Sequence, residues 1–471
     1  MKRQTRRSFL KTSIVGSAGL AVLPNILPRS LFAADAPSKR INVVLIGCGR
    51  EGRTDVEGTM AHSLVARVVG VCDLDSKRAA SAQQMITEFY KKKGESNVKI
   101  ETYHNYHDVL SRSDVDAVIV SVPDHQHALV ASSAAIAGKH IYVQKPLTYS
   151  IAESIALRSA VRAKKVILQA GSQQRSEHPF VAFRPASEAA RNGRLGKLTK
   201  IEIGIGLDKP SGKPPLAMQV PANFDYEHWL GPAPEQPYTE GRVHPQEGFG
   251  RPGWITTEDF GLGMITNWGA HHIDIAQWGM GMELSGPQTV TGTADFMKND
   301  VWTVHTDYHV EMNYANGVQV VLDNKFENGL RFIGSEGSVF CSRGAVRVTS
   351  SDPNLAGGAD TGKSALRWSD PKLASLPADA KRWPASSNHY LNWLEAIVAN
   401  RDPIAPVDQA ARSLQACATA WIAMKLKRKL TWDPGKEMFV NDDEANALRG
   451  RKARTPEYDV QGVLDRAGIK G

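Results

Sequence analysis

The sequence predicts an α/β protein in which an N-terminal doubly wound parallel sheet is followed by an α/β domain with an open, mostly antiparallel sheet. At 471 residues the chain is longer than one hydrophobic core usually supports, so two domains are expected. Between residues 41 and 170, apolar strands alternate with helical segments, as in parallel sheets. Between residues 290 and 348, shorter strands of alternating polarity are separated by Gly, Asn or Asp, which indicates an antiparallel sheet with one uncovered face.

The individual elements follow from hydrophobic periodicity and from the Gly and Pro residues that interrupt it. In the first part we expect strands at 41–46, 65–71, 117–122, 140–143 and 166–170, and helices at 76–93, 128–137 and 151–163. In the second part we expect strands at 303–312, 317–326, 330–333, 338–341 and 345–349, and helices at 388–399 and 409–427. These elements predict a first domain at 39–170, a second domain at 171–435 and a polar C-terminal tail at 436–471.

The N-terminus predicts a signal peptide at 1–34. Thr5–Lys11 matches the twin-arginine export pattern at each position and precedes an apolar run at 14–27. We therefore expect an exported, periplasmic protein that meets the twin-arginine export machinery; a plain basic tail is the alternative. The apolar run is too short, and too interrupted by Pro24 and Pro28, for stable insertion in a membrane.

The basic charge of the chain is concentrated in this segment. The whole sequence carries a net charge of +8, and six Lys and Arg residues with no acidic residue lie in 1–34, so removing six charges leaves +2. A nearly neutral mature protein gives no electrostatic argument for binding nucleic acid or an anionic membrane.

A glycine-rich motif follows the first predicted strand. Gly47, Gly49 and Gly52 have the spacing of a Rossmann phosphate loop, in which glycines permit a tight turn, close approach of a pyrophosphate and close helix packing. The loop also contains Cys48, Arg50 and Glu51. A structural turn without a ligand is the alternative. The context of strand, loop and helix favours a dinucleotide bound at the helix N-terminus.

Asp73 ends the second predicted strand, where Rossmann proteins place an acid against the adenosine ribose. A carboxylate there repels the 2′-phosphate of NADP, so NAD is favoured as the cofactor. Lys77 and Arg78 lie nearby and weaken this preference. A simple helix cap is the alternative role for Asp73.

Several further motifs together resemble the Gfo/Idh/MocA family, named for glucose-fructose oxidoreductase and inositol dehydrogenase. The motifs that carry the resemblance are the glycine loop, Asp73, Pro123–His127, Gly138–His140, Gln144–Pro146 and Trp268–Asp274. The resemblance implies a Rossmann domain followed by an α/β domain whose open sheet forms dimers or tetramers. The chain departs from the family pattern at Gln144, where Glu is usual, and at Asn267, where Asp is frequent.

The resemblance also implies a site. Lys145 would stabilise alkoxide charge and help to fix the nicotinamide ribose, and His271 would be the base. Asn267 can bind a sugar hydroxyl but cannot accept a proton, so His272 becomes a second candidate, while Asp274 would orient an imidazole or cap a helix. The remaining cofactor candidates are Ser121, Pro123, His127, Gln144 and Gln174, and the substrate candidates are Arg175, Trp229 and Trp268. Core packing is the alternative for each tryptophan. We predict no metal site.

These observations predict an NAD-dependent oxidoreductase acting on a secondary hydroxyl of a sugar, glycoside or cyclitol. An exported enzyme lacks a free nicotinamide pool, so the cofactor is expected to stay bound and to be recycled within the catalytic cycle. A redox-neutral glycoside hydrolase or lyase acting through a transient 3-keto intermediate is the alternative. A non-catalytic sugar sensor is a third hypothesis. The presence of both Lys145 and His271 disfavours it, because a sensor does not need both.

Overall fold

The computed structural model describes residues 40–208, 215–299, 301–344 and 365–470. The chain divides into two units, residues 1–38 and 39–471. The expected signal peptide at 1–34 and the expected strand at 345–349 both lie outside the described residues.

The first sheet is entirely parallel, with the strand order β3-β2-β1-β4-β5-β6. Its central strands are almost continuously apolar because helices cover both faces. This confirms the predicted doubly wound sheet. The strands are β1 (Ile41–Ile46), β2 (Ala66–Cys72), β3 (Glu101–Tyr103), β4 (Ala117–Val120), β5 (His140–Val143) and β6 (Leu168–Ala170).

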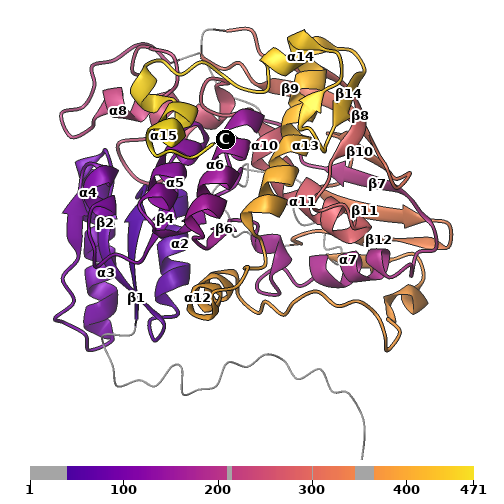
Figure 1. The fold of residues 1–471 in the computed structure, drawn as a ribbon, viewed down its shortest axis with the longest axis horizontal. Helices are drawn as coiled ribbons and strands as arrows, with labels where there is room; N and C mark the ends of the chain where they lie inside the picture. The colour runs from indigo at the N-terminus through magenta and orange to yellow at the C-terminus, as the bar shows by residue number, and fades with distance from the viewer. Residues whose placement is uncertain (1–39, 209–214, 300, 345–364, 471) are drawn as a thin grey trace, which may run out of the picture. The chain divides into compact units, whose positions relative to one another are not determined.

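Helices from both ends of the chain cover this sheet (Figure 1). One face packs on α2 (Arg50–Met60), α3 (Ser76–Lys92) and α12 (His389–Ala399). The other face packs on α4 (Tyr106–Leu110), α5 (His127–Ile136), α6 (Ile151–Lys164), the start of α13 (Val407–Leu426) and α15 (Val460–Arg466). The segment 436–471, expected as a polar tail, begins with β15 of the second sheet and ends with α15 on the first domain, where Val460 and Leu464 are buried.

The second sheet has nine strands in the order β13-β12-β11-β7-β10-β9-β8-β14-β15. The β7–β10 pair is parallel and the other pairs are antiparallel, as predicted. The strands are β7 (Leu198–Gly204), β8 (Pro287–Phe296), β9 (His305–Tyr314), β10 (Gln319–Asp323), β11 (Gly329–Gly334), β12 (Gly337–Cys341), β13 (Leu366–Trp368), β14 (Leu430–Asp433) and β15 (Met438–Phe439).

One face of this second sheet is covered by α7 (Phe183–Arg191), α11 (Gly269–Met280) and α13, which bury a large apolar core. On the opposite face, the charged side chains of Glu311 on β9 and Arg331 on β11 are partly exposed. The remaining short elements are α8 (Tyr226–Leu230), α9 (Glu240–Val243), α10 (Met264–Asn267), α14 (Asp443–Ala447) and the 3-10 turns at Asp124–Gln126, Gln173–Arg175, Gly253–Thr256, Pro371–Ala374 and Pro456–Tyr458.

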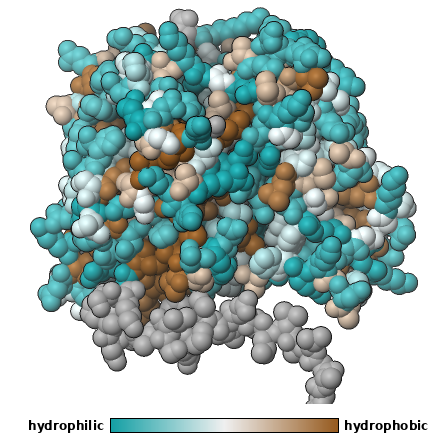
Figure 2. All heavy atoms as spheres, viewed as in Figure 1, coloured by the Kyte–Doolittle hydropathy of each residue, from teal (hydrophilic) through white to brown (hydrophobic). Residues whose placement is uncertain are grey.

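The surface is mixed in character. Figure 2 shows hydrophilic side chains over most of the visible face, with apolar side chains gathered mainly over the part that contains the first sheet. Within the described ranges, no helix has both the length and the apolar character needed to cross a membrane.

Candidate active site

The glycine loop connects β1 to α2 with the geometry of a phosphate-binding turn. Gly47 has a φ of +94°, and a Cβ at that position would lie 2.5 Å from the Ser121 carbonyl oxygen. A Cβ on Gly52 would lie 1.9 Å from the Gly47 carbonyl oxygen, so α2 can approach the loop only without a side chain there. A Cβ on Gly49 would meet only the Arg78 guanidinium, at 3.6 Å. The loop is therefore closely packed at its first and third glycines and open at its second, as a pyrophosphate requires.

Helix α2 begins at Arg50 without a side-chain cap, because its N-cap residue is Gly49. The first N–H groups of a helix have no partner inside the helix, and the dipole places partial positive charge there. An anionic pyrophosphate satisfies both features. The residues present therefore fit a dinucleotide cofactor.

Asp73 lies at the end of β2 and supports the loop. Its carboxylate accepts hydrogen bonds from the backbone N–H of Cys48, at 2.6 Å, and of Asp75, at 2.8 Å. Burial raises the pKa of Asp73. The cap of α3 is Asp75, which accepts from the N–H groups of Lys77 and Arg78. The helix-cap alternative for Asp73 is therefore wrong, and its carboxylate lies in the wall of the cavity described next.

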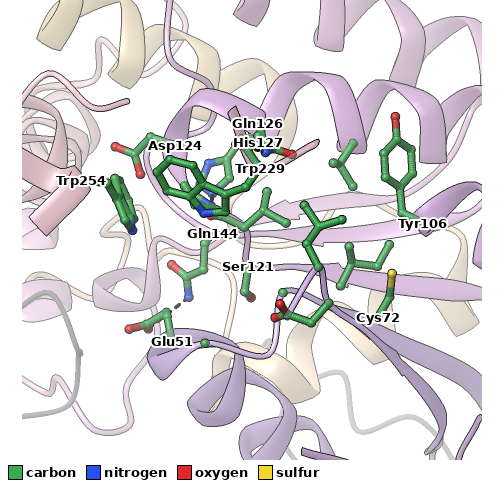
Figure 3. A pocket seen from close by; sticks show the side chains of 18 of the residues that line it. Glu51, Cys72, Tyr106, Ser121, Asp124, Gln126, His127, Gln144, Trp229 and Trp254 are labelled. Atoms are coloured by element: carbon green, nitrogen blue, oxygen red, sulfur yellow. Dashed lines mark hydrogen bonds between the residues drawn. The ribbon is translucent and has the colours of Figure 1, made fainter. Parts of the chain in front are cut away.

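A cavity of about 370 Å³ extends from the glycine loop into the second domain (Figure 3). Figure 3 shows Tyr106 and Cys72 on one side of the cavity and Asp124 and Trp254 on the other. The lining also includes Asp73, His104, Lys145 and Asn267. The predicted cofactor residues in its wall are Gly47, Gly49, Arg50, Glu51, Asp73, Ser121, Pro123, His127, Gln144 and Lys145. The fold thus brings most of the predicted cofactor set to one cavity.

Both basic residues beside Asp73 contact residues of the second domain. The buried Arg78 guanidinium donates to the carbonyl oxygen of Pro245 at 2.9 Å and lies 5.1 Å from the centre of the Phe249 ring. The Lys77 ammonium is exposed and lies 3.8 Å from a Glu247 carboxylate oxygen. Arg78 nevertheless lines the cavity, with Nη1 3.6 Å from the place of a Cβ on Gly49. The preference for NAD over NADP therefore rests on Asp73, whose carboxylate would repel a 2′-phosphate.

Asp124 is a cavity residue that the sequence interpretation did not select. It begins the short turn Asp124–Gln126 after β4, is 4% exposed and lies in the cavity wall, as Lys145 does. Figure 3 shows Asp124 beside Trp254. Burial raises the pKa of Asp124 to about 7, although the nearby Lys145 ammonium acts in the opposite direction. The sequence does indicate this role, because Asp124 follows the proline that closes a parallel strand. Ligands bind beyond the carboxyl ends of such strands.

Gln144 occupies the position where the family usually has Glu, and its surroundings account for the amide. Its Nε2 donates to Asp55 Oδ1 at 2.7 Å and to Glu51 Oε1 at 3.3 Å, and its Oε1 accepts from the Lys145 N–H at 3.1 Å. Ser121 and Tyr390 also donate to the Asp55 carboxylate. Burial, followed by repulsion from Glu51, raises the pKa of Asp55 to about 8. A third carboxylate at position 144 would face two existing ones, whereas the amide donates to both.

His271 lies one helical turn beyond Asn267, on the same side of the α10–α11 segment. Asn267 reaches the cavity wall, whereas His271 is 1% exposed and is absent from that wall. Neither ring nitrogen of His271 has a hydrogen-bond partner within the described part of the chain. Burial, and then the positive charges of Arg343 and Lys145, lower the pKa of His271 well below its usual range. The ring is therefore neutral at physiological pH.

Four of the predicted polar site residues, Arg175, His272, Asp274 and Gln174, contact other protein groups and are absent from the cavity wall. Arg175, predicted at the substrate, donates through Nε and Nη2 to the Asp274 carboxylate at 2.6 and 2.7 Å, and both side chains are at most 2% exposed. Asp274 therefore neither orients an imidazole nor caps a helix. His272 is fully buried against Asn328, at 3.1 Å, and burial lowers its pKa to about 3. Gln174 is buried between the His271 carbonyl oxygen and Arg343 Nε, at 3.0 and 3.1 Å.

The tryptophans divide between the cavity and the core. Trp229 and Trp254 line the cavity. Trp268, predicted at the substrate, is buried against the Arg343 guanidinium, 4.5 Å from its ring centre, and is absent from the cavity wall. The rings of Trp229 and Trp254 thus give the cavity, which Lys145 also lines, two flat apolar surfaces. Among the described residues, no group of three or more His, Cys, Asp or Glu side chains has the arrangement of a metal site.

The fold and the cavity define an NAD-binding Rossmann oxidoreductase. Residues 41–172 match the family described as "Oxidoreductase family, NAD-binding Rossmann fold", and residues 208–356 match "Oxidoreductase family, C-terminal alpha/beta domain". The chain belongs to the Gfo/Idh/MocA oxidoreductase family, which confirms the resemblance predicted from its motifs.

Among curated proteins, the chain is 32% identical to glycosyl hydrolase family 109 protein 2 of Shewanella sp. strain ANA-3 over 161 residues, which covers 31% of this chain and 35% of that protein. It is 26% identical to inositol 2-dehydrogenase 1 of Saccharopolyspora erythraea over 205 residues, which covers 43% of this chain and 52% of that protein. The match thus spans about a third of the first relative and about half of the second.

Among solved structures, the aldose-aldose oxidoreductase of Caulobacter crescentus, complexed with glycerol, has a TM-score of 0.57 at 16% identity and covers 83% of this chain and 99% of its own. The WlbA dehydrogenase of Chromobacterium violaceum, in complex with NADH and UDP-GlcNAcA, has a TM-score of 0.59 at 16% identity and covers 88% of this chain and 99% of its own. At these identities the similarity shows the fold alone.

Proposed function

We propose that the protein oxidises a secondary hydroxyl of a sugar, glycoside or cyclitol with NAD. The observation that carries this proposal is one cavity that joins the phosphate loop to Lys145, Asp124, Trp229 and Trp254. Aromatic faces provide large apolar contact surfaces suited to the C–H face of a sugar ring. The name of the inositol 2-dehydrogenase relative supports the substrate class.

The cofactor would be held by the chain's own loop and acid. The N–H groups at the start of α2 would bind the pyrophosphate, and Asp73 would accept hydrogen bonds from the adenosine ribose. When bound, the nicotinamide supplies the hydride acceptor for the carbon that carries the substrate hydroxyl.

The hydroxyl proton needs a separate acceptor. Lys145 is placed to stabilise the developing alkoxide, and Asn267 can orient a neighbouring hydroxyl. We assign proton acceptance to Asp124, because it lies in the cavity wall and its pKa of about 7 suits a general base. His271, the base expected from the family, is the competing assignment. Its buried ring would need a substrate group to reach past Asn267.

We further propose that the cofactor remains bound through the catalytic cycle. Thr5–Lys11 predicts export, and outside the cytoplasm no nicotinamide pool is expected to replace a reduced cofactor. Each hydride removed must then be returned, either to a second carbonyl substrate or to the same sugar after it has been altered.

A redox-neutral glycoside hydrolase or lyase is the second candidate, favoured by the glycosyl hydrolase family 109 relative. In this case oxidation at C3 acidifies the C2 proton, elimination expels the leaving group from C1, and water adds across the C1–C2 double bond that forms. The hydride taken from C3 is then returned to the C3 ketone. The net reaction is hydrolysis without accumulation of NADH.

One experiment tests both candidates. The protein is incubated with NAD and a panel of sugars, cyclitols and nitrophenyl glycosides, while reduced nicotinamide and nitrophenol are followed together. NADH formation supports the oxidoreductase, and nitrophenol without net NADH supports the hydrolase. Binding of sugars with no reduction of bound nicotinamide, no nitrophenol and no conversion of a sugar pair into oxidised and reduced products would contradict both and favour a sensor.

A further inference from the structure

A segment of the second domain, residues 221–255, lies along the edge of the first domain where β2 meets α3; we call it the strap. Two backbone hydrogen bonds join them, from Asp225 N–H to the Leu74 oxygen at 3.0 Å and from Ser76 N–H to the Asn223 oxygen at 2.9 Å. The contact includes an antiparallel bridge between Asp75 and Phe224. The strap is therefore hydrogen-bonded to the first domain directly after Asp73.

The Asp75 carboxylate binds three side chains of the strap. It accepts hydrogen bonds from His244 Nε2 at 2.9 Å, Asn223 Nδ2 at 2.8 Å and Gln246 Nε2 at 3.1 Å. Its side chain is 2% exposed. Burial alone would raise the pKa of Asp75, but the hydrogen bonds from His244 and Asn223 outweigh burial and hold it well below its usual range. A buried carboxylate needs such donors, and the strap supplies three of them.

Two arginine side chains of the first domain also contact the strap. Arg78 donates to the Pro245 carbonyl oxygen, and the Phe249 ring of the strap lies 5.1 Å from the Arg78 guanidinium and 4.5 Å from that of Arg53. Arg53 belongs to α2 and Arg78 to α3, so the strap is attached to both helices that flank the adenosine end of the cavity.

The strap also forms a wall of that cavity. His228, Trp229, His244, Gly250, Pro252, Trp254 and Ile255 contribute to the lining, together with Asp73 and Leu74 of the first domain. A dinucleotide with its ribose at Asp73 would thus lie between the glycine loop and the strap. For it to leave along this side, the bonds at Asp75 and Arg78 must first break.

We propose that the strap retains NAD in its site and that the hydrogen bonds between Asp75 and the strap set the rate of NAD release. This proposal rests on the proposed function, in which the cofactor is recycled without leaving the protein. It adds that retention resides in a named segment of the second domain, separate from the phosphate loop.

The test measures NAD release from the full-length protein. Protein loaded with isotopically labelled NAD is freed of excess nucleotide, mixed with unlabelled NAD, and sampled for retained label. H244A removes one donor to Asp75, and F249A removes the ring between the two arginines. H309A is the matched control, because His309 also pairs with a carboxylate, Asp323 at 2.9 Å, but on the second sheet and outside the cavity wall.

Loss of a hydrogen bond to a charged group predicts release about ten- to a hundredfold faster in H244A. F249A should also release NAD faster, and H309A should match the wild type. Thermal unfolding of the nucleotide-free variants identifies any general loss of stability in H244A, in which case F249A decides. Wild-type release rates in both strap variants, or wild-type exchange complete within the mixing time, would overturn the proposal.

Failure of the proposed function would look different. If a sugar reduces added NAD while bound NAD exchanges freely, the strap proposal fails and the oxidoreductase stands. If the strap variants release NAD faster but no sugar or glycoside is turned over, retention stands and the proposed function fails.

Discussion

Asp124→Asn is the substitution that tests the assignment of the catalytic base. The change keeps the size of the side chain and its ability to hydrogen-bond, but removes the group that can accept a proton. Burial raises the pKa of Asp124 to about 7, so the carboxylate is ionised and active as a base above that pH. Activity that depends on this carboxylate should therefore be present above pH 7 and lost as the pH falls through about 7.

A positioned general base contributes about 10²- to 10⁴-fold to the rate. We expect D124N to lose this factor in kcat/KM above the pKa of Asp124, while NAD binding changes little because the phosphate loop is untouched. A buried acid with a raised pKa binds more protons in the folded state than in the unfolded state. The wild type should therefore lose stability as the pH rises toward 7, and D124N should be at least as stable there.

The assay is the pH dependence of kcat/KM for the wild type, D124N and H271N. If Asp124 is the base, the decline near pH 7 is present in the wild type and in H271N but absent from the residual activity of D124N. If His271 is the base, the decline lies well below its usual pKa, because burial and neighbouring charges lower the pKa of that ring. Near-wild-type rates in D124N would show that Asp124 is not the base.

Lys145→Ala should abolish turnover while bound NAD survives gel filtration, and unchanged turnover would remove Lys145 from the mechanism. Gly52→Ala places a Cβ 1.9 Å from the Gly47 oxygen and should abolish NAD binding in a fluorescence titration; retained affinity would contradict the role of the loop. Asp274→Asn leaves the Arg175 guanidinium buried without its carboxylate and should cost about 3–5 kcal/mol in chemical denaturation, with a change below about 1 kcal/mol as the contrary result. Sedimentation should show the dimer or tetramer that the family resemblance implies, and a monomer at all concentrations would contradict it.

The first domain was largely predictable because its strands are continuous apolar runs bounded by Gly or Pro. The missed strand β3 has three residues at the sheet edge, Glu101–Tyr103, and no apolar run to mark it. Strand β7 was also missed, although its residues alternate in polarity: Ile201 and Ile203 are buried, while Glu202 between them is not. The packing of α12 and α15 on the first domain was not predictable, because an apolar helix face does not specify its partner.

The site was predictable where a backbone motif determines it and less so where side chains choose partners. The cavity wall contains Gly47, Gly49, Asp73 and Lys145, because these residues follow strand ends of one parallel sheet. Arg175 and Asp274 have the residue types of a substrate site, but in the fold they satisfy each other. Asp55 carries no motif at all. Its importance appears only when α2 brings it against the Gln144 amide.

We propose that this chain is an NAD enzyme whose cofactor remains with the protein. The most direct measurement is to purify the protein without added nucleotide, denature it, and identify and quantify the nucleotide released by chromatography. We predict NAD or NADH close to one molecule per chain. A protein that releases no nucleotide, and that binds added NAD only weakly, would contradict the account.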